Sequence, residues 1–125
     1  MFHSYQKLGI WQKAIDLTVV VYDLVKKLPK EETYALSDQM RRAVVSIASN
    51  IAEGQERNST ADFIRFLNIA MGSKAELETQ IIIGNRIGYF SNDDIAQPMQ
   101  MTNEISKMTR GLISKLKTNP LKTEN

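Results

Sequence analysis

The sequence contains no cysteine, one histidine and three prolines in 125 residues, and these scarcities exclude several classes of protein. Without cysteine, the chain can form neither a disulfide nor a cysteine-ligated metal site, which fits a reducing compartment. The one histidine is His3, outside every expected helix, so a di-iron bundle built on paired Glu-x-x-His motifs is excluded. A histidine general base is excluded with it. We therefore expect no catalytic residue, no metal site and no cofactor.

Long hydrophobic runs are also missing. The longest, residues 17–22, is flanked by Asp16 and Asp23 and is far shorter than the roughly 18 residues of a membrane span. Residues 1–10 contain no apolar run of the kind found in a signal peptide. The sequence thus predicts a cytoplasmic protein without a membrane partner. Its length fits one domain, which we place at residues 1–117, with a disordered tail at residues 118–125.

Apolar residues recur with helical spacing in four segments, which predicts an all-α fold. The expected helices cover residues 10–28, 34–53, 59–88 and 91–117. The second helix has two possible ends, because Gly54 can supply a left-handed C-terminal cap or the helix can continue to Arg57. The connections are short and favour antiparallel neighbours, so we expect an antiparallel up-down-up-down four-helix bundle.

Local signals support these boundaries. Ser59 and Asp62 have the spacing of a capping box, and Gly88 is a plausible terminator of the third helix. Gly84 should weaken that helix by about 1 kcal/mol relative to alanine. Pro98 is tolerable if it lies in the first turn of the fourth helix. The residues of the fourth helix expected to face inward are Ile95, Met99, Thr102, Ile105, Met108, Leu112 and Leu116.

The first and third helices carry more apolar residues than one bundle core can bury. Ile81, Ile82 and Ile83 are consecutive, so their side chains point in directions about 100° apart. Clustered apolar surface of this kind favours a protein–protein interface, and we expect self-association. The interface residues that we predict are Val20, Ile64, Ile82 and Ile83.

Polar residues form a second pattern, on one face of each of the two middle helices. Ser46, Asn50 and Glu53 are spaced at i, i+4 and i+7 on the second helix, and Ser73, Glu76 and Gln80 fall similarly on the third. A turn centred near Arg57 would place Ala43 near Ser73, and Arg41 and Arg42 close to Glu76. The structural interpretation is a polar seam that fixes the register, so Glu76→Ala should be destabilising. The functional interpretation is a contact with a small molecule or nucleic acid.

Positive charge gathers on the fourth helix. The chain has a net charge of +2 and a pI near 8.9, which alone does not indicate a nucleic-acid binder. Lys107, Arg110, Ser114 and Lys117 share one face. Such a face can simply be solvated, since cations are favoured near a helix C-terminus. The candidate nucleic-acid-binding residues are Lys107, Arg110, Lys115, Lys117 and Arg57.

Two motifs resemble a known family. The segment LSDQMRRAVVSIASNIAEG at residues 36–54, followed by FLNIAMGS at 66–73 and ELETQ at 76–80, resembles the signature of the four helix bundle protein family. The first members of that family were found encoded in intervening sequences of bacterial 23S ribosomal RNA genes. WQKA at residues 11–14 fits as well, whereas Lys74 and Ala75 depart from a more apolar family pattern.

The resemblance implies a four-helix bundle assembled as a ring-shaped homopentamer, and it implies no activity. The signature residues that we interpret as structural are Arg41, Arg42, Ser46, Asn50, Glu53, Gly54, Gly72, Ser73 and Glu76. Relatives in the same superfamily are accessory proteins of diversity-generating retroelements, which are thought to bind nucleic acid and reverse transcriptase through a basic surface. Our leading hypothesis is a non-enzymatic, ribosome-associated or otherwise RNA-binding module that assembles with itself. The alternatives are a protein-interaction scaffold with no nucleic-acid role, a retroelement accessory protein, and a small-molecule binder that uses the polar seam.

Overall fold

Four long helices make up most of the structure, a computed structural model that describes residues 4–33 and 35–120. They are α1 (Gly9–Val25), α2 (Leu36–Gln55), α3 (Thr60–Ile87) and α4 (Asn92–Thr118). Two short 3₁₀ turns, η1 (Ser4–Lys7) and η2 (Lys30–Glu32), precede α1 and α2. No strand occurs in the described residues, so the predicted all-α fold is confirmed.

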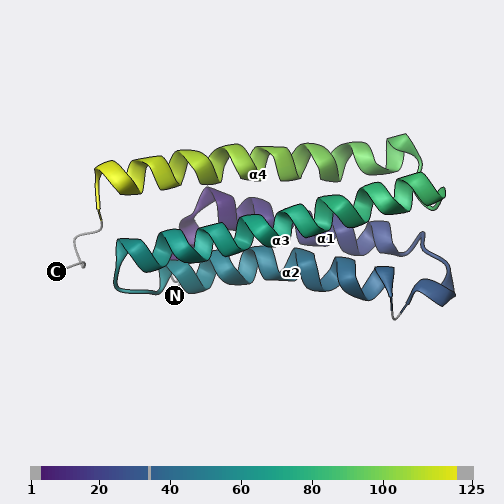
Figure 1. Cartoon of the computed structure of the whole chain (residues 1–125), viewed down its shortest axis with the longest axis horizontal. Helices are drawn as coiled ribbons and strands as arrows, with labels where there is room; N and C mark the ends of the chain where they lie inside the picture. Colours follow the sequence, from purple (N-terminus) through teal and green to yellow (C-terminus); the bar gives the residue numbers. More distant parts are fainter. Residues whose placement is uncertain (1–3, 34, 121–125) are drawn as a thin grey trace.

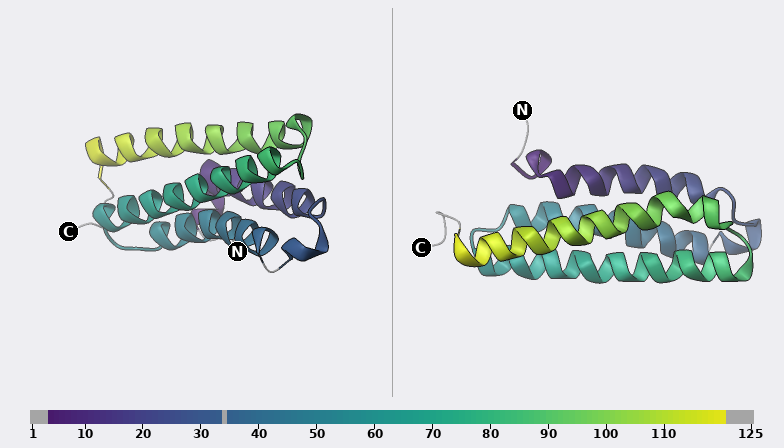
Figure 2. Two further views of the ribbon diagram at one scale, coloured as in Figure 1. Left: turned by 45° about the vertical axis from the view of Figure 1, so that its right-hand side comes forward. Right: turned by 90° about the horizontal axis from the view of Figure 1, so that it is seen from above.

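Each helix packs against the helices that precede and follow it along the chain, and α4 returns to pack against α1. Among the described residues, no α-carbon of α1 lies within 8 Å of one in α3, and the same holds for α2 and α4, so these pairs lie on the diagonals. The helices run side by side along the long axis of the molecule (Figures 1 and 2). The α1–α2 and α3–α4 turns lie at one end, and the α2–α3 turn lies at the other (Figure 1). This is the predicted antiparallel up-down-up-down bundle.

The ends of α3 and α4 follow the local signals. The Ser59 hydroxyl accepts a hydrogen bond of 3.1 Å from the backbone N–H of Asp62 and caps α3. Gly88 ends α3 in the left-handed region, with a φ of 101° that favours glycine. At the start of α4, Ser91 and Asp94 form a reciprocal capping box, with hydrogen bonds of 2.8 and 3.0 Å. Short polar side chains therefore start both helices.

The α1–α2 connection begins earlier than predicted. The α-helix ends at Val25, and the N–H groups of Lys26, Lys27 and Leu28 bond to carbonyls three residues back. Pro29 explains this tightening, because the residue before a proline is disfavoured in the α-helical region. The predicted start of the second helix, Tyr34, lies outside the described residues.

Of the two ends that the sequence allowed for the second helix, the left-handed cap at Gly54 does not occur. Gly54 lies inside α2, which continues to Gln55 with Glu56 as its C-cap. A β-carbon at Gly54 would lie 2.7 Å from Cβ of Phe66 and 3.1 Å from Cδ1 of Phe63. The glycine lets the end of α2 approach the start of α3 closely, which an alanine would prevent.

Proline in α4 also departs from the prediction. Because α4 begins at Asn92, Pro98 lies in its second turn, beyond the tolerant first positions. It is buried, and it cannot donate the backbone hydrogen bond that its position would otherwise make to the carbonyl of Asp94. Packing of the neighbouring apolar residues therefore holds this part of α4.

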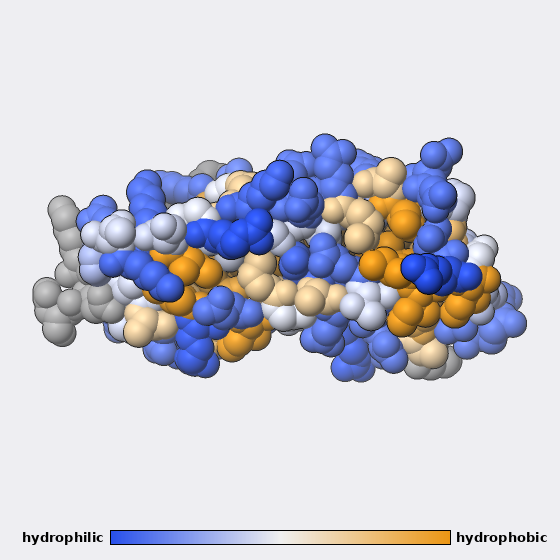
Figure 3. All heavy atoms as spheres, turned by 45° about the horizontal axis from the view of Figure 1, so that its top comes forward, coloured by the Kyte–Doolittle hydropathy of each residue, from blue (hydrophilic) through white to orange (hydrophobic). Residues whose placement is uncertain are grey.

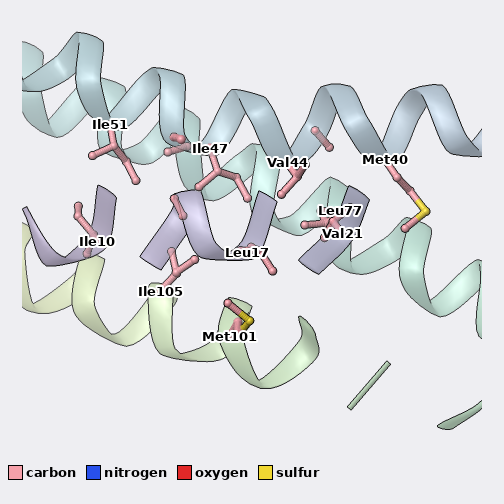
Figure 4. Close-up of a cluster of buried hydrophobic side chains, with 14 of the residues drawn as sticks. Ile10, Leu17, Val21, Met40, Val44, Ile47, Ile51, Leu77, Met101 and Ile105 are labelled. Atoms are coloured by element: carbon pink, nitrogen blue, oxygen red, sulfur yellow. The ribbon is translucent and has the colours of Figure 1, made fainter. Parts of the chain in front are cut away.

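The core runs the length of the bundle and receives side chains from all four helices. Ile10, Leu17 and Val21 of α1 meet Met40, Val44, Ile47 and Ile51 of α2, Leu77 of α3, and Met101 and Ile105 of α4 (Figure 4). Within the predicted inward stripe of α4, Met108 is the exception, because 39% of it is exposed. Thr102 is buried as predicted, and Met101 and Thr109, which were not predicted to face inward, are buried as well.

The end of the last helix lies close to the predicted domain boundary. The predicted domain boundary at residue 117 falls one residue before the end of α4 at Thr118. Residues 121–125 of the expected disordered tail, and His3, lie outside the described residues. None of the helices in the described part of the chain is long and apolar enough to cross a membrane.

Candidate functional site

A polar seam joins α2 to α3 halfway along the bundle. The hydroxyl oxygens of Ser46 and Ser73 are 2.8 Å apart, and Ser73 is buried. The Asn50 amide donates to the backbone carbonyl of Ser46 at 2.8 Å and to its hydroxyl at 2.9 Å. The structure thus brings Ser46, Asn50 and Ser73 together. Because these groups are paired with each other, they can fix the register of the two helices.

The expected pairing of Arg41 or Arg42 with Glu76 is wrong. Arg42 pairs with Asp38 at 3.0 Å, and Arg41 donates to the backbone carbonyl of Thr33 at 3.4 Å. Glu76 is exposed and makes no ion pair with a described residue. Both arginines therefore find local partners at the start of α2.

The other signature residues lie apart from the seam. Glu53 is exposed and pairs with Arg57 at 2.7 Å across one helical turn. Gly54 is buried against the start of α3. Gly72 is exposed, and a β-carbon there would meet no atom within 4 Å. The signature residues thus do not form one site.

The register explains the missing ion pair. Ser73 was expected opposite Ala43, but it contacts Ser46, nearly one turn closer to the α2–α3 turn. Each side chain leans towards the N-terminus of its own helix. In an antiparallel pair this lean carries the α2 side chains away from the connecting turn and the α3 side chains towards it. The residue on α3 that contacts a given α2 side chain therefore differs by several residues from the one obtained by pairing backbone positions symmetrically about the turn.

The cationic residues of α4 lie on its outer surface. Lys107, Arg110, Lys115 and Lys117 are all exposed, and none forms an ion pair with a carboxylate of the described residues. Glu104, the last acidic residue of α4, is neutralised by Lys13 of α1 at 2.8 Å. The C-terminal half of α4 thus presents cations without nearby counter-charges.

Arg57 differs from these four cations. Its guanidinium pairs with Glu53 and lies 4.9 Å from the centre of the Phe66 ring, while Arg65 approaches the same ring at 4.5 Å. Arg57 lies at the α2–α3 turn, at the end of the bundle where α4 finishes (Figure 1). Since its charge is already paired, it is the weakest of the nucleic-acid-binding candidates.

Apolar side chains remain exposed on α1 and α3. Val19 of α1 is 67% exposed, and Ile15 and Tyr22 flank it at helical spacing. On α3, Ile82, Ile83 and Ile87 are exposed, near the end that holds the α3–α4 turn. The face formed by α3 and α4 shows apolar areas between hydrophilic side chains (Figure 3). Of the predicted interface residues, Ile82 and Ile83 are exposed, whereas Val20 and Ile64 are half-buried against the core.

Polar contacts that the sequence did not predict link α4 and η2 to α3. Buried Thr102 donates to Glu78 at 2.7 Å, and Glu78 pairs with Lys74 at 3.1 Å. Near the α3–α4 turn, the Tyr89 hydroxyl donates to Glu32 at 3.0 Å, and this hydrogen bond raises the pKa of Tyr89 above its ordinary value. Lys74 and Glu78 are one helical turn apart, but Thr102 and Glu78, and Tyr89 and Glu32, are far apart in the sequence, so no local spacing reveals these two contacts.

No cluster of three or more potential metal-ligating side chains (His, Cys, Asp or Glu) occurs in the part of the chain that the structure describes. A hollow of about 610 Å³ lies on the outside of α1 and is lined by Thr18, Val19, Val20, Tyr22, Asp23, Lys26 and Gln97. Its two charged residues, Asp23 and Lys26, lie 3.8 Å apart, close enough to neutralise each other. The two charges of this hollow are thus paired with each other and not directed at a ligand.

The fold and its signature residues define a small antiparallel four-helix bundle. Residues 6–111 match the family of 23S rRNA-intervening sequence proteins, and the chain belongs to this family. It is similar to a crystal structure of a protein with unknown function from the S23 ribosomal protein family of Bacteroides thetaiotaomicron. The two share 30% sequence identity and a TM-score of 0.77 over 83% of this chain and 97% of the other. No curated protein matches.

Proposed function

We propose that this protein is a non-enzymatic module that assembles with itself and binds RNA, free or within a ribonucleoprotein, through the outer face of α4. The observation that carries the proposal is the set of four exposed cations, Lys107, Arg110, Lys115 and Lys117, which lack carboxylate partners among the described residues. No acidic residue occurs between Ile105 and Pro120. Lys107, Arg110 and Lys117 share one face of α4, and Lys115 lies on another side of the helix. An unneutralised cationic surface of this kind is one that phosphate groups favour.

Self-association supports this role. Exposed apolar residues occur on α1 and on α3, which lie on a diagonal of the bundle, so the two sets belong to different faces of the subunit. Two different patches on one subunit suit a head-to-tail contact, and such contacts form a ring when the rotation between successive subunits closes. The family resemblance supplies the number of subunits, five. A ring would repeat the α4 cations around the assembly and would give a positive field larger than a net charge of +2 per chain provides.

The test uses two variants that remove the same number of charges. One variant changes Lys107, Arg110, Lys115 and Lys117 to glutamine. The matched control changes Lys26, Lys27, Lys30 and Arg86, which are exposed and lie at the opposite end of the bundle (Figure 1). Binding to a labelled RNA is followed by fluorescence anisotropy over a series of salt concentrations.

We expect the α4 variant to bind weakly and the control to bind like the unaltered protein. If all four cations contact phosphates of a single strand, the slope of log affinity against log salt should become shallower by about 3 in the α4 variant. Equal losses in both variants would show that net charge, rather than α4, governs binding. No binding by the unaltered protein at low salt would reject the RNA role and favour the protein-interaction scaffold.

A further inference from the structure

The outer seam between α2 and α3 contains a polar hollow that the proposed function does not use. The hollow, here called the α2–α3 hollow, has a volume of about 310 Å³. Its lining residues are Gln39, Arg42, Ala43, Ser46, Ser73, Glu76 and Gln80. It is continuous with a second hollow further along α3, with which it shares Gln39, Glu76 and Gln80. The bonded serines of the polar seam therefore form part of its wall.

Gln80 is the unusual member of this lining. Its side chain is only 9% exposed, and its Oε1 atom is buried without a hydrogen-bond partner among the described residues. Buried polar groups are nearly always paired, so an unpaired one on a residue that lines a hollow indicates a partner that the described residues do not supply.

The two walls of the hollow differ in charge. On α3, Glu76 and Gln80 are four residues apart and lie on one face, where the carboxylate and the amide oxygen can both accept hydrogen bonds. On α2, Asp38 holds the Nε atom of Arg42 at 3.0 Å, which leaves the two terminal nitrogens of the guanidinium available. Gln39, three residues earlier, adds an amide donor. The α3 wall thus accepts hydrogen bonds and carries the unpaired charge of Glu76, and the α2 wall donates hydrogen bonds from Gln39 and from Arg42, whose charge is shared with Asp38.

We propose that the α2–α3 hollow binds a small zwitterion of the α-amino acid class. The ammonium group of the ligand donates to Glu76 and to Oε1 of Gln80, and its carboxylate accepts from Arg42. A charged ligand group that pairs with each wall satisfies Gln80 and neutralises Glu76, which has no ion-pair partner among the described residues. This site is independent of the RNA-binding face on α4.

The probes are the free proteinogenic amino acids, each added to the full chain at millimolar concentration. Binding is detected by ligand-observed NMR and then measured by calorimetry. Two further compounds with the side chain of the best ligand, one without the ammonium group and one without the carboxylate, test whether both charges are needed. Glu76→Gln and Gln80→Met are the site variants, and Glu53→Gln is the matched control, because Glu53 is an exposed carboxylate outside the hollow. Circular dichroism verifies the helix content of each variant.

We expect at least one amino acid to bind, and each site variant to weaken its affinity by about tenfold or more, since hydrogen bonds to charged groups are the strong ones. The control should bind like the unaltered protein, and both single-charge compounds should bind weakly. The proposal is overturned if no amino acid binds, if the single-charge compounds bind as well as the zwitterion, or if Glu76→Gln leaves the affinity unchanged. Glu76→Gln alters an exposed side chain, so the test does not depend on whether Gln80→Met folds.

Discussion

Replacing Gly54 with alanine tests how tightly α2 and α3 pack. In an isolated helix this change would stabilise by about 1 kcal/mol, because glycine is the poorer helix former. In the structure, however, the new methyl group would lie 2.7 Å from Cβ of Phe66 and 3.3 Å from the backbone carbonyl of Phe63. Neither atom is the free end of a flexible side chain, so the two helices must separate. Overpacking of this kind costs about 1–3 kcal/mol, which outweighs the helix preference.

We therefore expect Gly54→Ala to destabilise the protein by about 1–2 kcal/mol, which corresponds to a decrease in Tm of several degrees. Gly72→Ala and Gly111→Ala are the matched controls, because a β-carbon at either position meets no atom within 4 Å. Both lie within helices, so the same substitution should raise the Tm there. Thermal unfolding is followed by circular dichroism at one protein concentration, since the proposed assembly would make the Tm depend on concentration. An equal gain in stability at Gly54 and Gly72 would refute the close approach of α2 and α3.

Three further predictions follow from the contacts described above. Glu76→Ala should change the free energy of unfolding by less than about 0.5 kcal/mol, since the carboxylate is exposed and unpaired among the described residues. A large loss of stability in chemical denaturation would contradict this and would support the buried ion pair that the sequence predicted. The hydrogen bond from the backbone N–H of Ser91 lowers the pKa of Asp94 in the folded protein below its ordinary value of 3.8. The ionised carboxylate therefore stabilises the folded state fully above pH 3.8, and this stabilisation is lost as the pH falls through the pKa of the folded state. The difference in Tm between the unaltered protein and Asp94→Asn should therefore shrink below pH 3.8, and a difference that is constant with pH would contradict this assignment. Val19→Lys should reduce assembly and keep the helix content, because Val19 is 67% exposed, whereas Val20→Lys should also weaken the fold because Val20 packs against the core.

Local sequence signals predicted the helices and most of their ends. Ser59, Ser91 and Gly88 act within one or two helical turns, so the residues that cap each helix are close to it in the sequence. Glycine inside a helix is harder to interpret from sequence. By helix propensity, Gly84 should weaken α3. In the structure, a β-carbon at Gly84 would lie 2.5 Å from the ring of buried Phe90, so the glycine makes room for that ring. Gly54 has the same function towards Phe66, and neither role follows from helix propensity.

Contacts between helices were predicted less well than the helices themselves. The sequence placed Ser46 and Ser73 in one seam, but a register counted on the backbone paired the wrong residues, because it ignored the lean of side chains along each helix. Gln39 was not recognised as part of the candidate hollow, since a polar residue on a helix surface has no distinctive spacing. The link from Thr102 to Glu78 likewise depends on how α4 is rotated against α3, which sequence periodicity alone does not determine.

Self-association is the central claim, because it explains why apolar residues remain exposed on both α1 and α3. Its most direct test is the mass of the unaltered protein in solution, measured by sedimentation equilibrium at micromolar concentration. We expect an assembly of about five times the 14.2 kDa mass of one chain. A mass of 14.2 kDa that does not change with concentration would contradict the claim, and the exposed apolar residues would then require a different partner.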